Sequence, residues 1–300
     1  MENELFRIKE SIGNTPLIRL KKIEEKYNLQ AHIYCKLESH NLTGSVKDRA
    51  VFYMIKDLID KGIVDKSTTI IEPTSGNTGI SLSYICNLLG IKVLIVMPKS
   101  MSLERRIIIK RNGAKLVLID GGMKDCVEYV NKQIRVKSNY VTLNQFENTE
   151  GIKAHYETTG PEIFSQLDKV DCIVAGVGTG ATISGIGKYL KGLNTNIKIV
   201  GVEPTQSPLL TQGFSKPHKI EGIGPNFISK LFLKKYVDEI IDVDEIHSIE
   251  LAKEIYDIEN IYCGVSSGAA LLGALTYLKC NKKVENIVVI FPDSGDRYSW

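Results

Sequence analysis

The chain has 300 residues, of which 43% are hydrophobic, so it can bury the core of one large domain or of two packed domains. Its 38 basic and 35 acidic residues are interspersed and sum to a net charge of +3, which argues against a nucleic-acid-binding protein. No apolar run approaches the roughly 18 residues of a membrane span, and the N-terminus lacks the apolar segment of a signal peptide. Six cysteines without a Cys-x-x-Cys pair favour buried, reduced thiols. We therefore expect a cytoplasmic globular protein with no membrane segment and no metal site.

Short runs typical of strands alternate along the chain with helical patterns. Strands are predicted at 32–37, 69–71, 92–97, 115–119, 171–175, 197–202 and 286–291. Helices are predicted at about 48–61, 78–89, 102–112, 123–137, 150–167, 180–192, 246–258 and 267–278. This alternation predicts the α/β class, with mostly parallel sheets flanked by helices. Such sheets bind ligands beyond the carboxyl ends of their strands, on the loops that open the next helix.

A lysine stands at the start of the first strongly periodic helix. Lys47 precedes a run of apolar residues at helical spacing, Ser45 is a candidate N-cap, and Asp48 suits the positive end of the helix dipole. The positive end of that dipole does not stabilise a cationic lysine. This position therefore favours an amine that is easily deprotonated, as a Schiff base requires. Taken alone, Lys47 fits a solvated surface residue better. Only the other motifs favour the catalytic interpretation.

Small residues and hydroxyls gather after the predicted strand at 171–175. Gly178, Thr179, Gly180, Ala181 and Thr182 open a helix, where free backbone amides, close approach at glycine and threonine hydroxyls suit a phosphate group. A simple tight turn between a strand and a helix would also account for the glycines.

The same loop admits a rival interpretation. Gly176, Gly178 and Ala181 fit the dinucleotide fingerprint, and Glu203 lies near the distance expected of the ribose-binding carboxylate. An NAD-dependent dehydrogenase would leave Lys47 without a role, however, and the threonine hydroxyls suit a phosphomonoester better.

A second polar loop follows an earlier predicted strand. Thr74, Ser75, Gly76, Asn77 and Thr78 offer hydroxyls, a carboxamide and backbone amides at a helix start. That set suits a substrate carboxylate, although serine, asparagine and threonine are also common in ordinary capping turns.

These motifs together resemble the cysteine synthase (O-acetylserine sulfhydrylase) and cystathionine β-synthase family of fold-type-II pyridoxal-phosphate enzymes. The matching stretches are 12–17, 43–49, 72–80, 101–106, 145–146, 155–163, 176–182, 201–204, 221–224, 263–268 and 292–298. The resemblance implies a two-domain fold like that of the tryptophan synthase β chain. Residues 1–148 would contain a smaller, mobile domain at about 38–148, with the first segment crossing onto the larger, phosphate-binding domain at 149–300.

The resemblance also implies a role for each loop. Lys47 would bind pyridoxal 5′-phosphate covalently, Asn77 would bond the ring hydroxyl of the cofactor, and Ser266 would face its pyridine nitrogen. The phosphate would be held by Gly178, Thr179, Gly180, Ala181 and Thr182, and the substrate carboxylate by Thr74, Ser75, Gly76, Thr78 and Gln145. Ala181 departs from the commoner glycine, a change that a negative φ would tolerate.

The implied reaction is β-replacement, in which Lys47 removes the substrate α-proton and returns it after sulfide or a thiol has added at Cβ. We expect a cysteine synthase that makes L-cysteine from O-acetyl-L-serine and sulfide. The alternative is a cysteine-using β-synthase or lyase that releases hydrogen sulfide, because Pro225 and Asn226 stand where plain sulfhydrylases often have small residues.

The family resemblance implies a homodimer as well. It also raises the interpretation of a binding protein that holds the C-terminal tail of serine acetyltransferase. Two remaining groups of polar residues are expected to be unremarkable in role: His155 on a helix surface or at an interface, and Lys21, Lys22, Glu24 and Glu25 on a solvated helix face.

Overall fold

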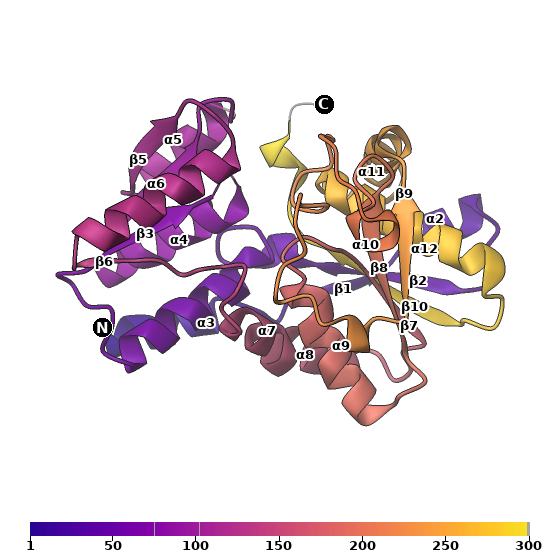
Figure 1. Cartoon of the computed structure of the whole chain (residues 1–300). Coiled ribbons are helices and arrows are strands. Elements are labelled where there is room, and N and C mark those ends of the chain that lie inside the picture. Colours follow the sequence, from indigo (N-terminus) through magenta and orange to yellow (C-terminus); the bar gives the residue numbers. More distant parts are fainter. Residues whose placement is uncertain (75, 102, 299–300) are drawn as a thin grey trace. The chain divides into compact units, whose positions relative to one another are not determined.

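Six strands of the computed structural model form one sheet, in the order β1-β2-β10-β7-β8-β9 (Figure 1). The structure describes residues 1–74, 76–101 and 103–298. The strands are β1 (Leu17–Arg19), β2 (His32–Leu37), β7 (Cys172–Gly176), β8 (Lys198–Pro204), β9 (Glu239–Val243) and β10 (Asn286–Phe291). Neighbouring strands are parallel, except that β1 runs antiparallel to β2.

Helices cover both faces of this sheet, because successive side chains of a strand point to opposite faces. Ile287, Val289 and Phe291 of β10 pack in one hydrophobic cluster, whereas Val288 and Ile290 pack in another. The first cluster includes side chains from α11 (Glu245–Glu259) and α12 (Val265–Cys280), with Ile23 of α2 (Lys21–Lys26). The second includes side chains from α8 (Gly160–Gln166) and α9 (Ala181–Leu193). Short elements complete this part: α7 (Glu150–Ala154), a π-helix (His155–Thr159) and α10 (Leu209–Gln212).

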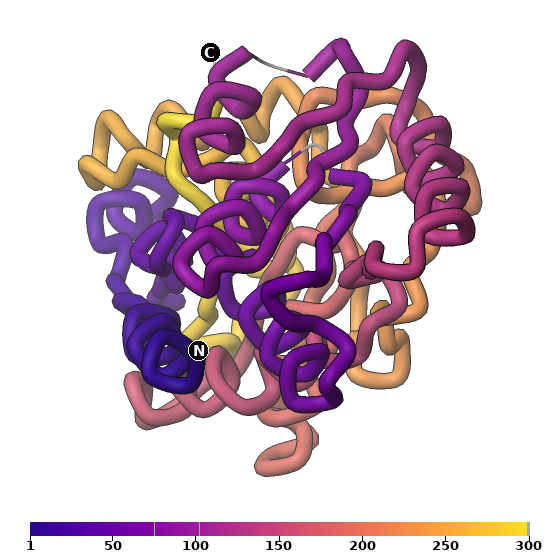
Figure 2. Tube along the Cα trace, turned by 90° about the vertical axis from the view of Figure 1, so that its left-hand side faces the viewer, coloured from indigo at the N-terminus to yellow at the C-terminus, as the bar shows by residue number. Residues whose placement is uncertain are grey.

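A second sheet has the order β5-β4-β3-β6, and all its strands are parallel. They are β3 (Thr69–Pro73), β4 (Lys92–Pro98), β5 (Lys115–Ile119) and β6 (Tyr140–Val141). One cluster joins this sheet to α1 (Glu2–Glu10), α3 (Lys47–Asp60), α4 (Asn77–Leu89) and α5 (Leu103–Arg111), and a smaller one joins it to α6 (Met123–Val136). Figure 2 shows α1 as the indigo coil at the N-terminus, and its Leu5 and Ile8 are buried in the larger cluster.

The chain divides into two compact units, each with one of these sheets. Met1–Ile12 and Asn41–Glu150 form the unit of the four-stranded sheet, and Gly13–His40 and Gly151–Trp300 form the unit of the six-stranded sheet. The early segment that carries β1, α2 and β2 therefore belongs to the same unit as the C-terminal half of the chain.

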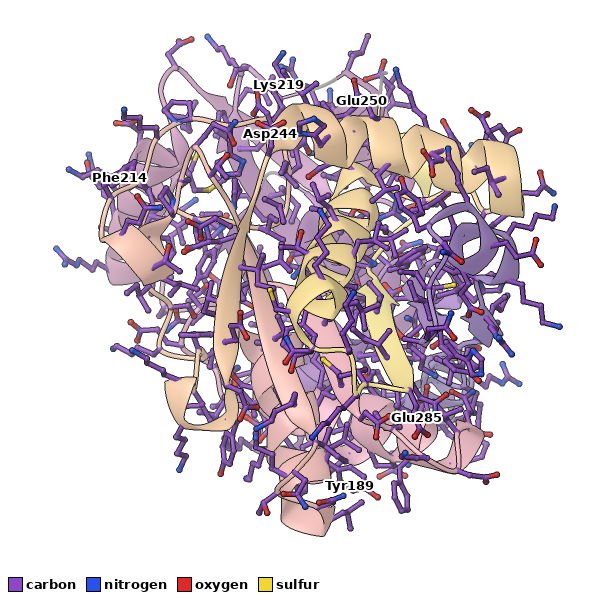
Figure 3. All side chains as sticks on the ribbon, turned by 90° about the vertical axis from the view of Figure 1, so that its right-hand side faces the viewer. Tyr189, Phe214, Lys219, Asp244, Glu250 and Glu285 are labelled. Carbon is purple, nitrogen blue, oxygen red and sulfur yellow. The ribbon has the colours of Figure 1, made fainter. Side chains whose placement is uncertain are left out.

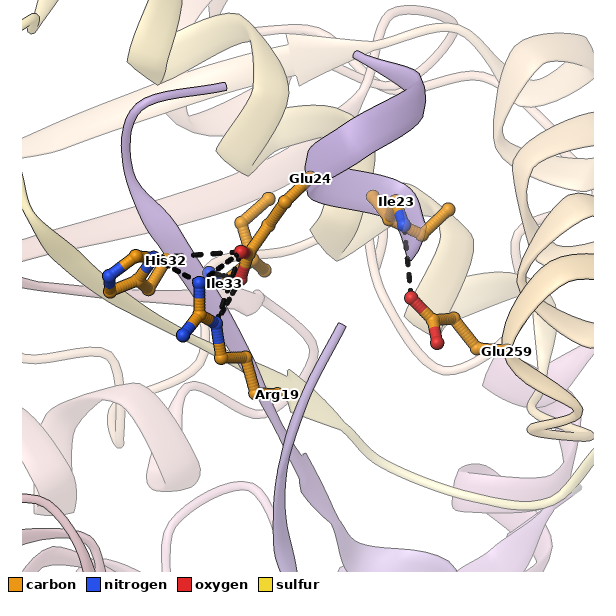
Figure 4. A network of polar contacts seen from close by, with 6 residues as sticks. All are labelled: Arg19, Ile23, Glu24, His32, Ile33 and Glu259. Atoms are coloured by element: carbon orange, nitrogen blue, oxygen red, sulfur yellow. Dashed lines mark hydrogen bonds and ion pairs between the residues drawn. The ribbon is translucent and has the colours of Figure 1, made fainter. Parts of the chain in front are cut away.

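Glu24 holds this early segment together (Figure 4). Its carboxylate accepts hydrogen bonds from Arg19 Nη2 at 2.7 Å, Arg19 Nε at 3.0 Å and the Ile33 amide at 2.8 Å, and Arg19 Nη2 lies 2.6 Å from His32 Nδ1. Glu24 is buried, so the expectation of a solvated helix face is wrong at this position. A carboxylate with a guanidinium and an amide as donors can leave water without losing its hydrogen bonds.

The predicted fold class is confirmed, and every predicted strand occurs. The sequence patterns do not predict α1 or the strands β1, β6 and β9, which are short and lie at the edges of their sheets. The predicted helix at 150–167 is interrupted by the π-helix. At the start of α11, Asp244 acts as N-cap (Figure 3): its Oδ1 accepts hydrogen bonds from the Ile246 and His247 amides at 2.9 and 3.0 Å.

The cysteines are mostly as expected. All six are free, and Cys35, Cys86, Cys126, Cys172 and Cys263 are buried. Cys280, at the end of α12, is exposed, so the expectation of buried thiols is wrong there. Among the residues that the structure describes, no helix has the length and apolar character needed to cross a membrane.

Candidate active site

Lys47 is the first residue of α3, and a short closed loop precedes it. The Asp48 carboxylate accepts hydrogen bonds from the Thr43 amide at 2.7 Å and the Thr43 hydroxyl at 2.6 Å. The N-cap position is occupied by Val46, so the expectation for Ser45 is wrong by one residue, although Ser45 Oγ accepts a 3.4 Å hydrogen bond from the Lys47 amide. The loop is thereby closed by Asp48 from within the helix, which fixes the point at which Lys47 leaves the backbone.

The loop between β3 and α4 brings hydroxyls to the N-terminus of a helix of 13 residues. Thr74 and Thr78 are buried, Gly76 is the N-cap, and Asn77 is the half-buried first residue of α4. A Cβ atom added at Gly76 would meet no atom within 4 Å, so the space beside this backbone is open. Ser75, which the sequence also places here, lies outside the described residues. Free amides at a helix N-terminus, with hydroxyls beside them, can bind a carboxylate.

Gln145 reaches this loop from the segment after β6, beside the residues with which the family resemblance groups it. The Thr78 hydroxyl donates a 2.8 Å hydrogen bond to Gln145 Oε1, and Gln145 Nε2 donates to the Pro73 carbonyl at 3.4 Å. Thr78 and Gln145 are 67 positions apart in the sequence, so tertiary structure alone brings them together.

In the other unit, the loop between β7 and α9 has the geometry of a phosphate cradle. A Cβ at Gly178 would lie 2.1 Å from the Gly222 carbonyl oxygen, and Gly180 has a φ of +81° and is the N-cap of α9. The Ser184 amide donates to the Gly180 carbonyl at 3.0 Å, so the amides ahead of it in the first turn have no carbonyl of the helix to bond. Thr179 Oγ1 accepts a 3.3 Å hydrogen bond from the amide of Ala181. Ala181 has no positive φ, which explains why alanine is tolerated there.

His155 holds the last hydroxyl of this loop. Its Nε2 lies 3.2 Å from Thr182 Oγ1, and its Nδ1 lies 2.9 Å from Thr159 Oγ1. Its side chain is buried, so the expectation of a helix-surface or interface residue is wrong. The π-helix His155–Thr159 places both of these groups, and its wider turn is a form often found at functional sites.

Ser266 lies in the first turn of α12, which begins at Val265. The residue is 3% exposed, which places its hydroxyl largely out of water at the start of this helix.

The geometry is against the dinucleotide interpretation. Glu203 is buried, and both of its carboxylate oxygens are in use: Oε2 accepts the Leu210 amide at 2.8 Å, and Oε1 accepts the Thr211 amide at 2.8 Å and the Thr211 hydroxyl at 2.7 Å. Burial raises the pKa of Glu203, and these hydrogen bonds oppose the rise. Its oxygens cap α10 and are not available to a ribose.

The loop that contains Pro225 and Asn226 is tied to Val177, the residue between β7 and the phosphate loop. The Gly224 amide donates to the Val177 carbonyl at 2.9 Å, and the Gly224 carbonyl oxygen lies 2.9 Å from His218 Nε2. Pro225 is half-buried and Asn226 is exposed, so Asn226 is the side chain of this pair that is open to a ligand.

A family model described as "Pyridoxal-phosphate dependent enzyme" matches residues 8–293. The chain belongs to the pyridoxal-phosphate dependent enzyme family. Cysteine synthase B of Campylobacter jejuni is 43% identical over 295 residues, which cover 97% of this chain and 96% of that protein. The crystal structure of a hydrogen sulfide-producing enzyme from Fusobacterium nucleatum is similar, with a TM-score of 0.94 and 41% identity over 97% of both chains. The crystal structure of a cysteine synthase from Entamoeba histolytica is also similar, with a TM-score of 0.93 and 39% identity over 97% of this chain and 88% of that one.

The residues of this pyridoxal-phosphate enzyme fit its cofactor. Gly178 is fixed by the close approach of the Gly222 backbone, which leaves no room for a side chain, and Gly180 opens a helix whose first amides can bind a phosphate. The buried hydroxyl of Ser266 suits a ring nitrogen, and a neutral hydroxyl, unlike a carboxylate, does not hold that nitrogen protonated. No group of three or more His, Cys, Asp or Glu in the described part of the chain is placed to hold a metal ion.

The sequence patterns missed two residues of the site. His155 was assigned to a surface because a histidine in a helical pattern gives no sign of its partners. The second is Glu72, a buried carboxylate of β3 that binds the segment carrying Gln145. Glu72 follows the predicted strand at 69–71 and opens the matching stretch at 72–80, but nothing in these patterns shows its partners.

Proposed function

We propose that this pyridoxal-phosphate enzyme catalyses β-replacement and makes L-cysteine from O-acetyl-L-serine and sulfide. The observation that carries the proposal is the Thr78–Gln145 hydrogen bond at the N-terminus of α4, because it forms a compact polar site for an amino-acid carboxylate beside Asn77. The similarity to a protein named cysteine synthase B over 97% of this chain supports the same reaction.

Each site residue then has a task. Lys47 carries the cofactor, removes the proton from the substrate Cα and returns it after the sulfur nucleophile has added at Cβ. Thr74, Gly76, Thr78 and Gln145, with Ser75, orient the substrate through its carboxylate. Pyridoxal 5′-phosphate, when bound, supplies the electron sink for the charge that develops at Cα.

The remaining residues hold the cofactor. Gly178, Thr179, Gly180, Ala181 and Thr182 bind its phosphate through backbone amides and hydroxyls. Asn77 bonds its ring hydroxyl, and Ser266 bonds its ring nitrogen. No cationic side chain belongs to this phosphate set, so helix-terminal amides are the principal donors.

Substitution of Lys47 tests the proposal directly. Lys47→Ala should abolish both turnover of O-acetyl-L-serine with sulfide and the visible absorbance of a lysine-linked cofactor, while the far-ultraviolet circular dichroism is unchanged. Borohydride reduction of the wild-type protein followed by peptide mapping should find the modified lysine in the peptide that contains Lys47. Lys56→Ala is the matched control, because Lys56 is an exposed lysine of the same helix, paired with Asp60. Turnover that persists in Lys47→Ala would refute this mechanism.

A second candidate function is the release of hydrogen sulfide from L-cysteine. It is favoured by the similarity to a hydrogen sulfide-producing enzyme at a TM-score of 0.94. It is also favoured by Asn226, an exposed polar residue of the loop whose Gly224 amide bonds the Val177 carbonyl. Incubation of the purified enzyme with L-cysteine alone distinguishes the two: rapid sulfide release supports this function, and its absence supports the synthase.

We also propose that the enzyme is a cytoplasmic homodimer. Exposed aromatic side chains such as Phe164 and Tyr156 offer apolar surface for self-association. Light scattering coupled to size exclusion should give twice the chain mass of 33.4 kDa. Binding of a synthetic C-terminal peptide of serine acetyltransferase, detected by competition with O-acetyl-L-serine, would add the partner implied by the family resemblance.

A further inference from the structure

Glu72 is a buried acidic residue two positions before Thr74. It lies in β3, is 1% exposed and faces the segment that follows β6. Its Oε2 accepts the Thr142 hydroxyl at 2.6 Å and the Leu143 amide at 2.9 Å, and its Oε1 lies 3.4 Å from the Gln145 amide. One carboxylate therefore accepts hydrogen bonds from three donors within residues 142–145.

That segment has little other support from the sheet. The ladder between β3 and β6 ends at the pair formed by Ile70 and Val141, immediately before Thr142. The backbone then passes through Asn144, which has a φ of +54°, a conformation that side-chain-bearing residues seldom adopt. Because strand pairing has ended, the hydrogen bonds to Glu72 hold the amides of Leu143 and Gln145 in place.

Gln145 carries the consequence to the site. Its backbone amide is held by Glu72, and its side chain lies between the Thr78 hydroxyl and the Pro73 carbonyl. A shift of the Gln145 backbone would misplace the carboxamide with respect to the first turn of α4.

We propose that Glu72 is a positioning residue of the substrate-carboxylate subsite, which fixes the segment at 142–145 and so sets the orientation of Gln145. The inference rests on the proposed function, since it gives that subsite to an amino-acid substrate. Glu72 touches neither substrate nor cofactor in this role and acts only through Gln145.

A carboxylate meets this requirement better than its amide. Both oxygens of Glu72 face donors, so a glutamine of the same volume would direct its NH2 group at a backbone amide, whichever way it turned. Burial raises the pKa of Glu72, and the hydrogen bonds from Thr142, Gln145 and Leu143 counteract that rise by favouring the charged form.

The test uses the holoenzyme and L-serine, an amino acid with the substrate carboxylate, as the binding probe. Glu72→Gln should weaken L-serine binding measured by calorimetry about tenfold, as expected for one lost hydrogen bond to a charged group. The KM for O-acetyl-L-serine should rise by a similar factor while kcat changes less than about threefold. A double-mutant cycle with Gln145→Ala should be non-additive, because Glu72 acts through Gln145.

Milder variants protect the test against misfolding. Thr142→Val removes one donor to Glu72 and should weaken L-serine binding in the same direction by less, whereas Thr142→Ser keeps the hydroxyl and should bind as wild type. Hydrogen exchange should be faster at the Leu143 and Gln145 amides in Glu72→Gln, and this readout needs neither cofactor nor turnover.

The outcomes separate this inference from the proposed function. If Glu72→Gln and Thr142→Val both bind L-serine with the affinity of the wild type, the role of Glu72 is overturned and the proposed function is not. The same holds if the effects of Glu72→Gln and Gln145→Ala on L-serine binding are additive. A wild-type holoenzyme that neither binds L-serine nor turns over O-acetyl-L-serine would instead overturn the proposed function.

Discussion

His155 Nε2 lies 3.2 Å from Thr182 Oγ1, and this contact connects a buried histidine to the phosphate loop. The other ring nitrogen of His155 lies 2.9 Å from the Thr159 hydroxyl, so the ring is oriented from both sides. A hydroxyl with a fixed orientation binds a phosphate oxygen at a lower entropic cost than a freely rotating one.

Loss of this contact should weaken cofactor binding. Thr182→Val removes the hydroxyl and should raise the dissociation constant of pyridoxal 5′-phosphate about fivefold to tenfold, which corresponds to roughly 1 kcal/mol for one hydrogen bond. The dissociation constant can be measured by titrating apoenzyme with cofactor and following absorbance. Ser165→Ala, which removes an exposed hydroxyl of α8, serves as the control and should bind cofactor as wild type. Equal affinities for wild type and Thr182→Val would contradict the proposed role of Thr182.

Two glycines of the site should respond in opposite ways to a methyl group. Gly178→Ala would place Cβ 2.1 Å from the Gly222 carbonyl oxygen, so either the loop or the backbone at Gly222 must move. We expect it to lower the free energy of unfolding by about 1–3 kcal/mol and to impair cofactor binding. Gly76→Ala adds its Cβ to open space, and its φ of −139° suits alanine.

For Gly76→Ala we therefore expect a free energy of unfolding within about 0.5 kcal/mol of wild type. Substrate binding should nevertheless be weaker, because the methyl group enters the space beside the carboxylate loop. Denaturant titration of both variants, with KM for O-acetyl-L-serine as the second measurement, tests the pair. Unimpaired stability in Gly178→Ala would show that the cradle is less closely packed than these distances require.

A buried lysine makes the strongest stability prediction. The Lys36 side chain has no exposed surface, and its Nζ lies 2.7 Å from Glu162 Oε2 and donates to the Thr15 carbonyl at 2.7 Å and to Gln166 Oε1 at 2.8 Å. Lys36→Met would remove the cation that faces a largely buried carboxylate and one hydrogen-bond donor from each of two acceptors, of which the Thr15 carbonyl keeps a bond from Gln166 Nε2 at 3.0 Å. The free energy of unfolding should fall by about 3–5 kcal/mol, the usual cost of breaking a buried ion pair.

The control for this prediction is Lys56→Met, which breaks an exposed pair with Asp60 on one helix. An exposed pair of this spacing contributes about 0.3–0.5 kcal/mol. Equilibrium unfolding in urea measures both variants. If the free energy of unfolding falls by the same amount in both variants, the ion pair and hydrogen bonds of Lys36 do not stabilise this part of the six-stranded sheet.

Asp65 predicts a change of stability in acid. Hydrogen bonds from the Ser67 hydroxyl and amide, with others from Thr68, lower the pKa of Asp65 from 3.8 to about 2. Because the folded state favours the charged form, this contribution is present above pH 3.8 and is lost as the pH falls toward 2. Asp65→Asn should therefore reduce the loss of stability between those pH values. Denaturant titrations from pH 5 to pH 2 measure it, and parallel curves for the two proteins would argue against the lowered pKa.

The sequence patterns predict the long strands and helices, but they do not predict which polar side chains are buried. Runs such as that of β10, in which Ile287, Val288, Val289 and Ile290 are all buried, can only be covered on both faces, so they predict a parallel sheet between helices. Short edge strands carry no such run, which is why β6, with two half-buried residues, is not predicted. The expectations for Glu24 and His155 failed for a different reason, since a charged or polar side chain in a helix is exposed unless distant residues provide its partners.

The sequence by itself determined the fold class, the glycine-rich loops and the lysine at the start of α3, because helical and strand periodicity and the conformational freedom of glycine are local properties of the chain. Tertiary structure alone decided which polar groups meet. The partners of these contacts are far apart along the chain: Thr78 with Gln145, Glu72 with the segment after β6, and His155 with Thr182. Hydrogen bonds depend on distances of about 3 Å, which no local pattern specifies until the sheets and helices have packed.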